Sequence, residues 1–313
     1  AALGMAHSIA DFNRDGLLDF IMIGMNSAVA DRLASARLKR PYEVPDAGKR
    51  DALAFGNRLF FGSADGRFVQ RPLSAQVART GWSWGSSAAD FNNDGFPDLY
   101  IANGHATRAS THDYESEFWL HDVYVGTSRE NSVTDTYFRQ KLKTAVDSGH
   151  SYGGYERNRL FLNLAGTNFV EVAHLFGLSL PEDSRNVAAQ DLDRDGRLDL
   201  IVTTFEQHPI ARQTVRFYRN KLDDVGQSIV ITLTNQLNTG AVASLVTTEN
   251  DTTHTNAFTI LPGESYRTQL PPRHQLGLGS VRNPATHVSP EIFKIETHES
   301  LPILAPGSNG GPQ

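Results

Sequence analysis

One nine-residue pattern occurs three times in this chain without gaps, and it limits the fold more than any other feature. The pattern is Asp-x-Asp/Asn-x-Asp-Gly-x-x-Asp, and a short apolar run of β-strand composition follows each copy directly. The three copies occupy residues 11–19, 90–98 and 191–199. Repetition of one supersecondary unit is typical of propellers and solenoids, in which each unit packs against its neighbours.

A second repeated element stands at a constant distance from the first. Residues 57–61 read Asn-Arg-Leu-Phe-Phe and residues 158–162 read Asn-Arg-Leu-Phe-Leu, with a degenerate copy at 216–220. The unit therefore reads strand, loop, strand, connection and hairpin, and four short strands per unit are the anatomy of a propeller blade. We interpret the repeated Arg58 and Arg159 as polar anchors between blades.

The nine-residue loop has the composition of a calcium site. Calcium binds six to eight oxygen atoms, and alternate positions of a tight loop direct oxygens at one centre, while a glycine at position 6 permits the turn. Positions 1, 3, 5 and 9 are Asp or Asn in every copy, and position 7 offers a backbone carbonyl. The predicted Ca²⁺ ligands are Asp11, Asn13, Asp15, Leu17, Asp19, Asp90, Asn92, Asp94, Phe96, Asp98, Asp191, Asp193, Asp195, Arg197 and Asp199.

The alternative to calcium is that each Asp-Gly pair is a hairpin turn and nothing more. Three in-frame copies with an acid or amide at all four ligand positions favour calcium. The third loop has four carboxylates and the other two have three each, so we expect the third to bind most tightly.

These observations predict an all-β fold of β-propeller blades with calcium loops and helical insertions, followed by a small β-domain. Residues 28–40 and 135–146 have helical composition and form the predicted insertions. We expect the repeats to cover 1–222 and the β-domain 223–304, with a disordered Pro- and Gly-rich tail at 305–313. Three units are fewer than the roughly 4–8 of a closed propeller, so we expect a missing N-terminal part to supply the remaining blades.

The repeats resemble the FG-GAP/VCBS repeats of integrin-α-like propellers, over residues 6 to about 220. Downstream, Gly263-Glu264-Ser265-Tyr266 and Leu276-Gly277-Leu278-Gly279 resemble the ASPIC/UnbV domain of proteins related to cartilage acidic protein. Gln275-Leu276 replaces the His-Phe of that family's signature, and its Trp-Pro-x-Gly strand is absent. The resemblance implies a secreted, periplasmic or cell-surface protein and no agreed chemistry.

The composition argues against several classes of partner and site. The formal net charge is -6 and no Lys/Arg cluster stands out, which argues against a nucleic-acid partner. There is no cysteine, so disulfides and thiolate metal sites are excluded. No apolar run approaches the ~18 residues of a membrane span.

The insertion at 104–157 holds the sharper candidate residues. His105, His112 and His121 are possible ligands of a second metal, although their spacing matches no fixed motif, and a polar solvent-facing loop is the competing interpretation. Gly81–Gly85 matches Gly-x-Ser-x-Gly, but a strand and a calcium loop follow where a hydrolase needs a helix, so we do not expect Ser83 to be a nucleophile.

Two functions follow from these predictions. The first is an extracellular calcium-binding repeat protein that acts as a binding, adhesion or scaffold module for an unknown protein or glycan, with no catalytic residues. The second is a metal-dependent enzyme whose site is built from the insertion histidines. A bound transition metal would distinguish them, because the first function requires calcium alone.

Overall fold

The computed structural model describes residues 4–36, 52–125, 131–222, 229–235, 241–249, 252–260, 265–270, 275–278 and 293–299. Side chains are described within 4–33, 35–36, 52–120 and 131–222. The strands form two units, one holding β1 to β13 and the other β14 to β19.

The first sheet is an antiparallel meander of four strands, in which neighbours in sequence are neighbours in space. It contains β1 (Gly4–Ala10), β2 (Asp19–Gly24), β3 (Arg58–Gly62) and β4 (Phe68–Val69). The first predicted calcium loop connects β1 to β2, and Ala10 pairs with Asp19 across it. The 3-10 helix η1 (Pro72–Val77) follows the sheet.

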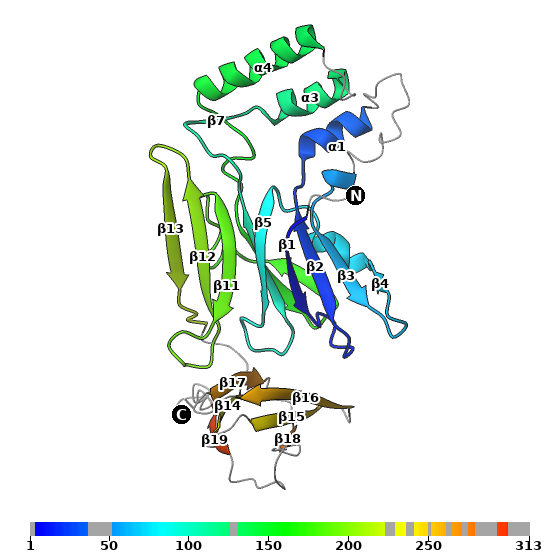
Figure 1. Ribbon diagram of the computed structural model, residues 1–313, viewed down its shortest axis with the longest axis vertical. Helices are drawn as coiled ribbons and strands as arrows, with labels where there is room; N and C mark the ends of the chain where they lie inside the picture. The colour runs from blue at the N-terminus through cyan, green and yellow to red at the C-terminus, as the bar shows by residue number, and fades with distance from the viewer. Residues whose placement is uncertain are drawn as a thin grey trace, which may run out of the picture. The chain divides into compact units, whose positions relative to one another are not determined.

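The second sheet repeats this order with β5 (Ser83–Ala89), β6 (Asp98–Asn103), β9 (Arg159–Leu164) and β10 (Asn168–Glu171). The third sheet contains β11 (Ser184–Gln190), β12 (Asp199–Glu206) and β13 (Arg212–Tyr218). The second and third predicted calcium loops connect β5 to β6 and β11 to β12. The predicted order of strand, loop, strand and hairpin is therefore present in the first two sheets, whereas the third sheet has one strand, β13, where the hairpin is expected. Strands β1, β5 and β11 lie side by side (Figure 1).

Two apolar cores lie between the sheets, and β6 contributes to both. Side chains alternate between the two faces of a strand, so Leu99 and Ile101 enter the core shared with Leu59, while Tyr100 enters the core shared with Val202. Every residue of β6 is buried, which explains its nearly continuous apolar sequence.

Buried asparagines tie each hairpin to the neighbouring elements. Asn158 accepts a hydrogen bond from the Asn103 backbone N–H (2.8 Å) and donates to the Tyr100 hydroxyl (3.0 Å) and to Ser184 Oγ (2.8 Å). Because Ser184 begins β11, Asn158 joins the second sheet to the third. Its repeat equivalent Asn57 also forms three hydrogen bonds.

The contacts of Arg58 and Arg159 do not support the interpretation of these repeated arginines as anchors between blades. Arg58 donates to the nearby Ala52 carbonyl (3.0 Å), and Arg159 lies 3.6 Å from Glu171 of its own sheet. The adjacent asparagines serve as the anchors because an amide both donates and accepts, whereas a guanidinium only donates.

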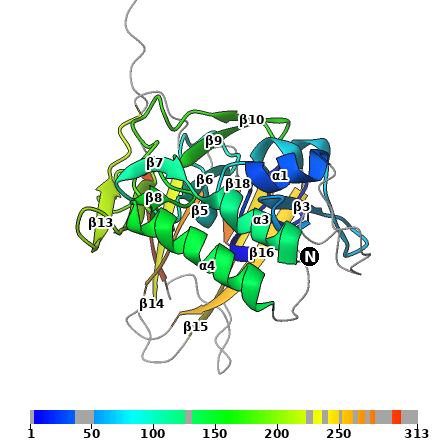
Figure 2. The same cartoon turned by 90° about the horizontal axis from the view of Figure 1, so that it is seen from above.

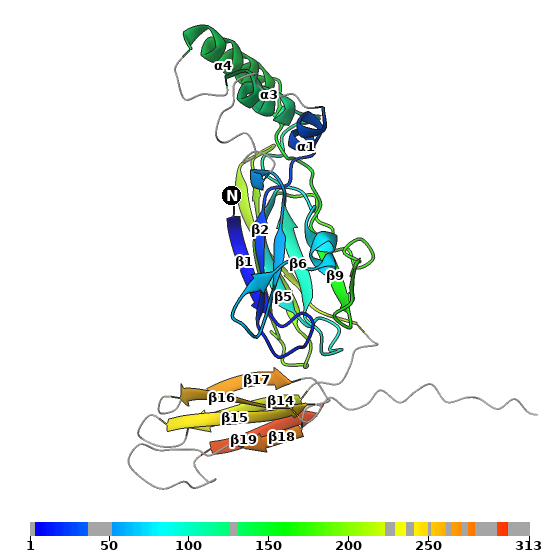
Figure 3. The same cartoon turned by 90° about the vertical axis from the view of Figure 1, so that its right-hand side faces the viewer.

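The insertions form helices at one end of the repeat sheets (Figures 1 and 3). Helix α1 (Ala28–Ser35) covers part of the predicted 28–40, and 37–40 lie outside the described residues. Helix α4 (Ser132–Asp147) contains the predicted 135–146, and the Asn131 side chain caps it. Helix α3 (Glu115–Val125) lies beside α4 (Figure 2). The parallel pair β7 (Ser110–Asp113) and β8 (His150–Ser151) joins this insertion to the sheets.

The second unit contains two three-stranded antiparallel sheets. One has the order β17 (Ser265–Leu270), β14 (Ile229–Asn235), β19 (Phe293–Glu299). The other has the order β16 (Thr252–Ile260), β15 (Ala241–Glu249), β18 (Gln275–Leu278). The predicted tail lies outside the described residues. The described chain is mostly β-strand in antiparallel sheets, as the all-β class requires, and propeller closure stays a prediction.

Candidate functional site

The three predicted calcium loops share one backbone conformation. Position 4 has a positive φ in each loop, namely 56° at Arg14, 53° at Asn93 and 64° at Arg194. The glycine at position 6 has a φ of 83°, 93° and 85° in the three loops. A positive φ is costly for a residue with a side chain, by roughly 1 kcal/mol or more. Its recurrence at position 4 indicates that the same loop geometry is built three times.

In the first loop the ligand side chains turn back onto the loop backbone. The Asp11 carboxylate accepts from the N–H groups of Asp15 (3.2 Å) and Gly16 (2.8 Å). Asn13 Oδ1 accepts from Asp15 N–H (3.2 Å), and Asp15 Oδ1 accepts from Leu17 N–H (3.0 Å). These bonds hold the oxygens of positions 1, 3 and 5 on the inner side of one turn. Burial raises the pKa of Asp11, and the charge of Asp15 raises it further.

The third loop brings three carboxylates together. One oxygen each of Asp191, Asp193 and Asp195 lies within 4.8 Å of the other two. Among the described side chains, this is the one group of three or more potential ligands found that close together. Like charges at this separation repel, and a hard divalent cation that prefers oxygen relieves the repulsion. The donor set therefore fits Ca²⁺.

An ion pair inside the third loop was not anticipated from the sequence. The Arg197 guanidinium donates to Asp195 Oδ2 (2.5 Å), and the Arg197 backbone N–H donates to Asp195 Oδ1 (3.0 Å). A cation bound to Asp195 must therefore compete with the guanidinium, which opposes the higher carboxylate count of this loop.

The aspartates at position 9 differ from the other ligand candidates of the loops because their side chains are almost fully buried. Asp19 accepts from the backbone N–H groups of Phe12 and Gly62, both at 2.9 Å, and so connects its loop to β3. Asp98 accepts in the same way from Phe91 and Asn163, both at 2.9 Å. Burial raises the pKa of Asp19 to about 6, with smaller additions from the Asp11 and Asp15 charges.

These carboxylates anchor the loops, a role that the sequence did not reveal. Asp199 accepts from the backbone N–H of Asn220 (2.8 Å), which follows β13, so each of the three copies ties its loop to the third strand of its sheet or to the residues just after that strand. A carboxylate has about four lone-pair directions, so anchoring leaves capacity for a cation. Calcium ligation by these carboxylates stays a prediction, as it does for positions 1, 3, 5 and 7 of the loops.

The three candidate histidines of the second metal do not form one group in the described part of the chain. His105 lies among aromatic rings, whereas His112 lies near His150, with ring centroids 5.4 Å apart. The His121 side chain lies outside the described residues. Two imidazoles are fewer than the three protein ligands of a typical catalytic zinc site.

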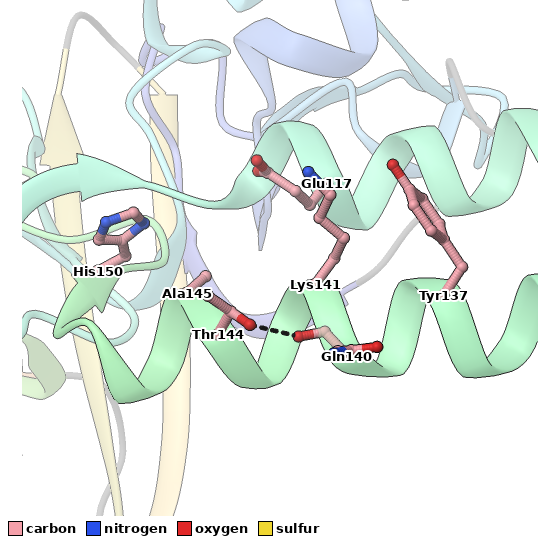
Figure 4. A pocket seen from close by; sticks show the side chains of 7 residues that line it. All are labelled: Glu117, Tyr137, Gln140, Lys141, Thr144, Ala145 and His150. Carbon is pink, nitrogen blue, oxygen red and sulfur yellow. Dashed lines mark hydrogen bonds between the residues drawn. The ribbon is translucent and has the colours of Figure 1, made fainter.

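A pocket of about 430 Å³ opens between α3 and α4, next to His150 (Figure 4). Glu117 of α3 faces Lys141 of α4, and Thr144 Oγ1 donates within α4 to the Gln140 carbonyl (2.9 Å). The pocket is lined by Glu117, Tyr137, Gln140, Lys141, Thr144, Ala145 and His150. Although most of these side chains carry a polar group, the exposed lining is mostly apolar, so the pocket does not select a hydrophilic molecule.

The aromatic cluster consists of Trp82, Trp84, His105 and Tyr152, at the ends of β5, β6 and β8. The Trp82 and His105 rings are stacked, with centroids 4.3 Å apart and an interplanar angle of 8°. Trp84 stacks on His105 at 5.5 Å, and Tyr152 meets Trp82 edge-on at 5.0 Å. Burial, assisted by the Arg185 charge, lowers the pKa of His105 to about 4. His105 is therefore neutral at physiological pH.

A carboxyl group borders this cluster. Glu156 accepts a hydrogen bond from the Trp82 backbone N–H (2.5 Å). Burial raises the pKa of Glu156 to about 8, against the effect of that bond, and the charges of Glu115, Asp113 and Asp183 add to the rise.

Ser83 begins β5 and is fully buried, with its hydroxyl donating to Asn103 Oδ1 (2.7 Å). A strand followed by a loop is the context that the sequence predicted for it. A hydroxyl in this position serves the packing of β5 on β6.

Comparison with protein families supports the repeat interpretation. Residues 46–101 match the model of an FG-GAP-like repeat, a stretch that contains the β3–β4 hairpin, β5 and the second predicted calcium loop. No curated protein matches the chain. None of the described helices combines the length and apolarity that crossing a membrane requires.

Proposed function

We propose that this chain is an extracellular calcium-binding β-propeller repeat protein that acts as a binding, adhesion or scaffold module. The observation that carries the calcium assignment is the convergence of Asp191, Asp193 and Asp195 within 4.8 Å. An isolated turn has no need for three carboxylates so close together. The FG-GAP-like match at 46–101 supports the same class of module.

The outer faces of the first and third sheets support the proposal of further blades. Phe217 is 66% exposed on β13, although its repeat equivalents Leu59 and Leu160 are buried between sheets. Ile9 of β1 is 56% exposed, although its equivalent Ala88 packs in the first core. Large apolar side chains at positions that are buried elsewhere in the repeat indicate faces made for packing. Additional blades would cover these faces.

The location outside the cell and the ASPIC/UnbV character of the C-terminal unit rest on the sequence resemblance. An antiparallel β-domain is compatible with that resemblance. The alternative function is a metal-dependent enzyme whose site is built from histidines of the 104–157 insertion, where the His112 ring lies 5.4 Å from that of His150. Elemental analysis of the purified chain separates the two, because calcium without a transition metal is expected for the module.

Removal of calcium tests the proposed function. A cation that binds only the folded state stabilises it by RT ln(1 + [L]/Kd), which is about 2.7 kcal/mol at one hundred times Kd. We therefore expect a chelator to lower the melting temperature of the repeat unit, monitored by tryptophan emission, and added Ca²⁺ to restore it. A melting curve that the chelator leaves unchanged would contradict the calcium assignment.

A further inference from the structure

The aromatic cluster lies at the opposite end of β5 from the second calcium loop. Trp82 and Trp84 stand at the start of the strand, whereas the loop follows Ala89 at its end. Seven residues of extended chain separate the two ends by roughly 20 Å. The cluster and the second predicted calcium loop are therefore separate sites.

Unpartnered polar atoms are concentrated in this cluster. Nine buried polar atoms within the described side chains have no hydrogen-bond partner, and four of them belong here: Trp82 Nε1, Trp84 Nε1, His105 Nδ1 and Tyr152 Oη. Each such atom costs roughly 1–3 kcal/mol, and native proteins contain few of them. Four such atoms in one cluster indicate a site for a ligand that forms hydrogen bonds with them.

The hydrogen-bonding character of these atoms restricts that partner. The indole N–H groups of Trp82 and Trp84 donate only, so the ligand must offer acceptor oxygens, and an organic cation such as a quaternary ammonium offers none. The charges beside the cluster have opposite signs, because the Arg185 guanidinium lies 4.5 Å from the centroid of the Trp84 ring and the Asp183 carboxylate is near enough to influence Arg185. With no net charge to select an ion, the cluster favours a neutral ligand.

A neutral saccharide meets both conditions. Its hydroxyl oxygens accept from indole N–H and its hydroxyl hydrogens are accepted by carboxylates, while the C–H face of the ring packs on aromatic side chains. Trp82 and Trp84 are both partly exposed, so their rings are reachable from solvent. Aromatic walls with a few placed polar groups are the usual lining of small-molecule sites.

We propose that the cluster of Trp82, Trp84, His105 and Tyr152 binds one ring of a neutral saccharide. This inference rests on the proposed binding role and names its ligand class. Because the four polar atoms lie beneath the surface, the partly exposed indoles turn when the sugar enters, and tryptophan emission changes.

The test is a tryptophan-fluorescence titration of the calcium-loaded chain with neutral tetrasaccharides of glucose, mannose and N-acetylglucosamine, and with choline and glucuronate. One neutral saccharide is expected to shift the emission and to saturate. Absence of binding by every neutral saccharide, or binding of choline or glucuronate in their place, overturns the proposal.

Two phenylalanine variants locate the site. Tyr152→Phe removes one unpartnered hydroxyl and keeps the ring, so it should weaken saccharide binding roughly tenfold while leaving the melting temperature equal or higher. The matched control Tyr137→Phe changes the pocket between α3 and α4 and should leave the affinity unchanged. Affinity that falls for Tyr137→Phe and not for Tyr152→Phe moves the site to that pocket and overturns the assignment.

The outcome is separable from the calcium proposal. Saccharide binding with no calcium bound contradicts the calcium role alone. Calcium binding with no saccharide bound contradicts this inference alone.

Discussion

Replacing Asn158 by alanine removes the buried amide that joins the second and third sheets. The Asn103 backbone N–H then loses its acceptor inside the protein, which costs roughly 2 kcal/mol. The Tyr100 hydroxyl still donates to the Leu178 carbonyl, and Ser184 Oγ still donates to the Glu182 carbonyl. Loss of the two bonds that Asn158 donates to Tyr100 and Ser184 therefore costs only about 1 kcal/mol each. We expect Asn158→Ala to lower the free energy of unfolding by about 4 kcal/mol.

Urea unfolding of the calcium-loaded chain measures this loss. All three tryptophans of the chain, Trp82, Trp84 and Trp119, belong to the repeat unit, so their emission reports its unfolding. With a slope of about 2 kcal/mol/M, the midpoint should fall by about 2 M. The control Asn168→Ala, at an exposed position of β10, should change stability by less than about 0.5 kcal/mol. Equal midpoints for the two variants would refute the anchoring role of Asn158.

Two further predictions concern charged groups. Arg197→Leu frees Asp195 from its ion pair, so calcium affinity of the third loop should rise by up to about fivefold in a calorimetric titration; weaker binding would show that the guanidinium supports the site. The pKa of Glu156 is raised to about 8 from an ordinary 4.5, so its contribution to stability is complete below pH 4.5 and is lost as the pH rises towards 8. Glu156→Gln should therefore gain in melting temperature relative to the natural chain between pH 4.5 and 8, and a constant difference across that range would refute the raised pKa.

The sequence predicted the parts of the fold that depend on local pattern. The strands after each loop, β2, β6 and β12, follow from apolar runs beside an Asp-Gly turn, and α4 follows from the spacing of Phe138, Leu142 and Val146. Helix α3 was missed because its apolar residues, including Phe118, Trp119 and Leu120, are consecutive and mark no single face.

The functional contacts that the sequence could not predict are long-range. Asp19 is an aspartate like the ligand candidates Asp11 and Asp15 of its loop, and only its burial against β3 distinguishes it as an anchor. The cluster of Trp82, His105 and Tyr152 joins positions far apart in the chain, so no spacing rule could find it. The repeated Asn158 was visible in the sequence, but its role depends on partners in two sheets.

Calorimetric titration of Ca²⁺ into the chelator-treated chain, compared with its Asp195→Ala variant, tests the central claim most directly. The account predicts saturable binding to the natural chain, a modest loss of third-loop affinity for Asp193→Asn and a larger loss for Asp195→Ala. Absence of saturable binding, or identical titrations of the natural chain and Asp195→Ala, would show that these loops are turns and not calcium sites.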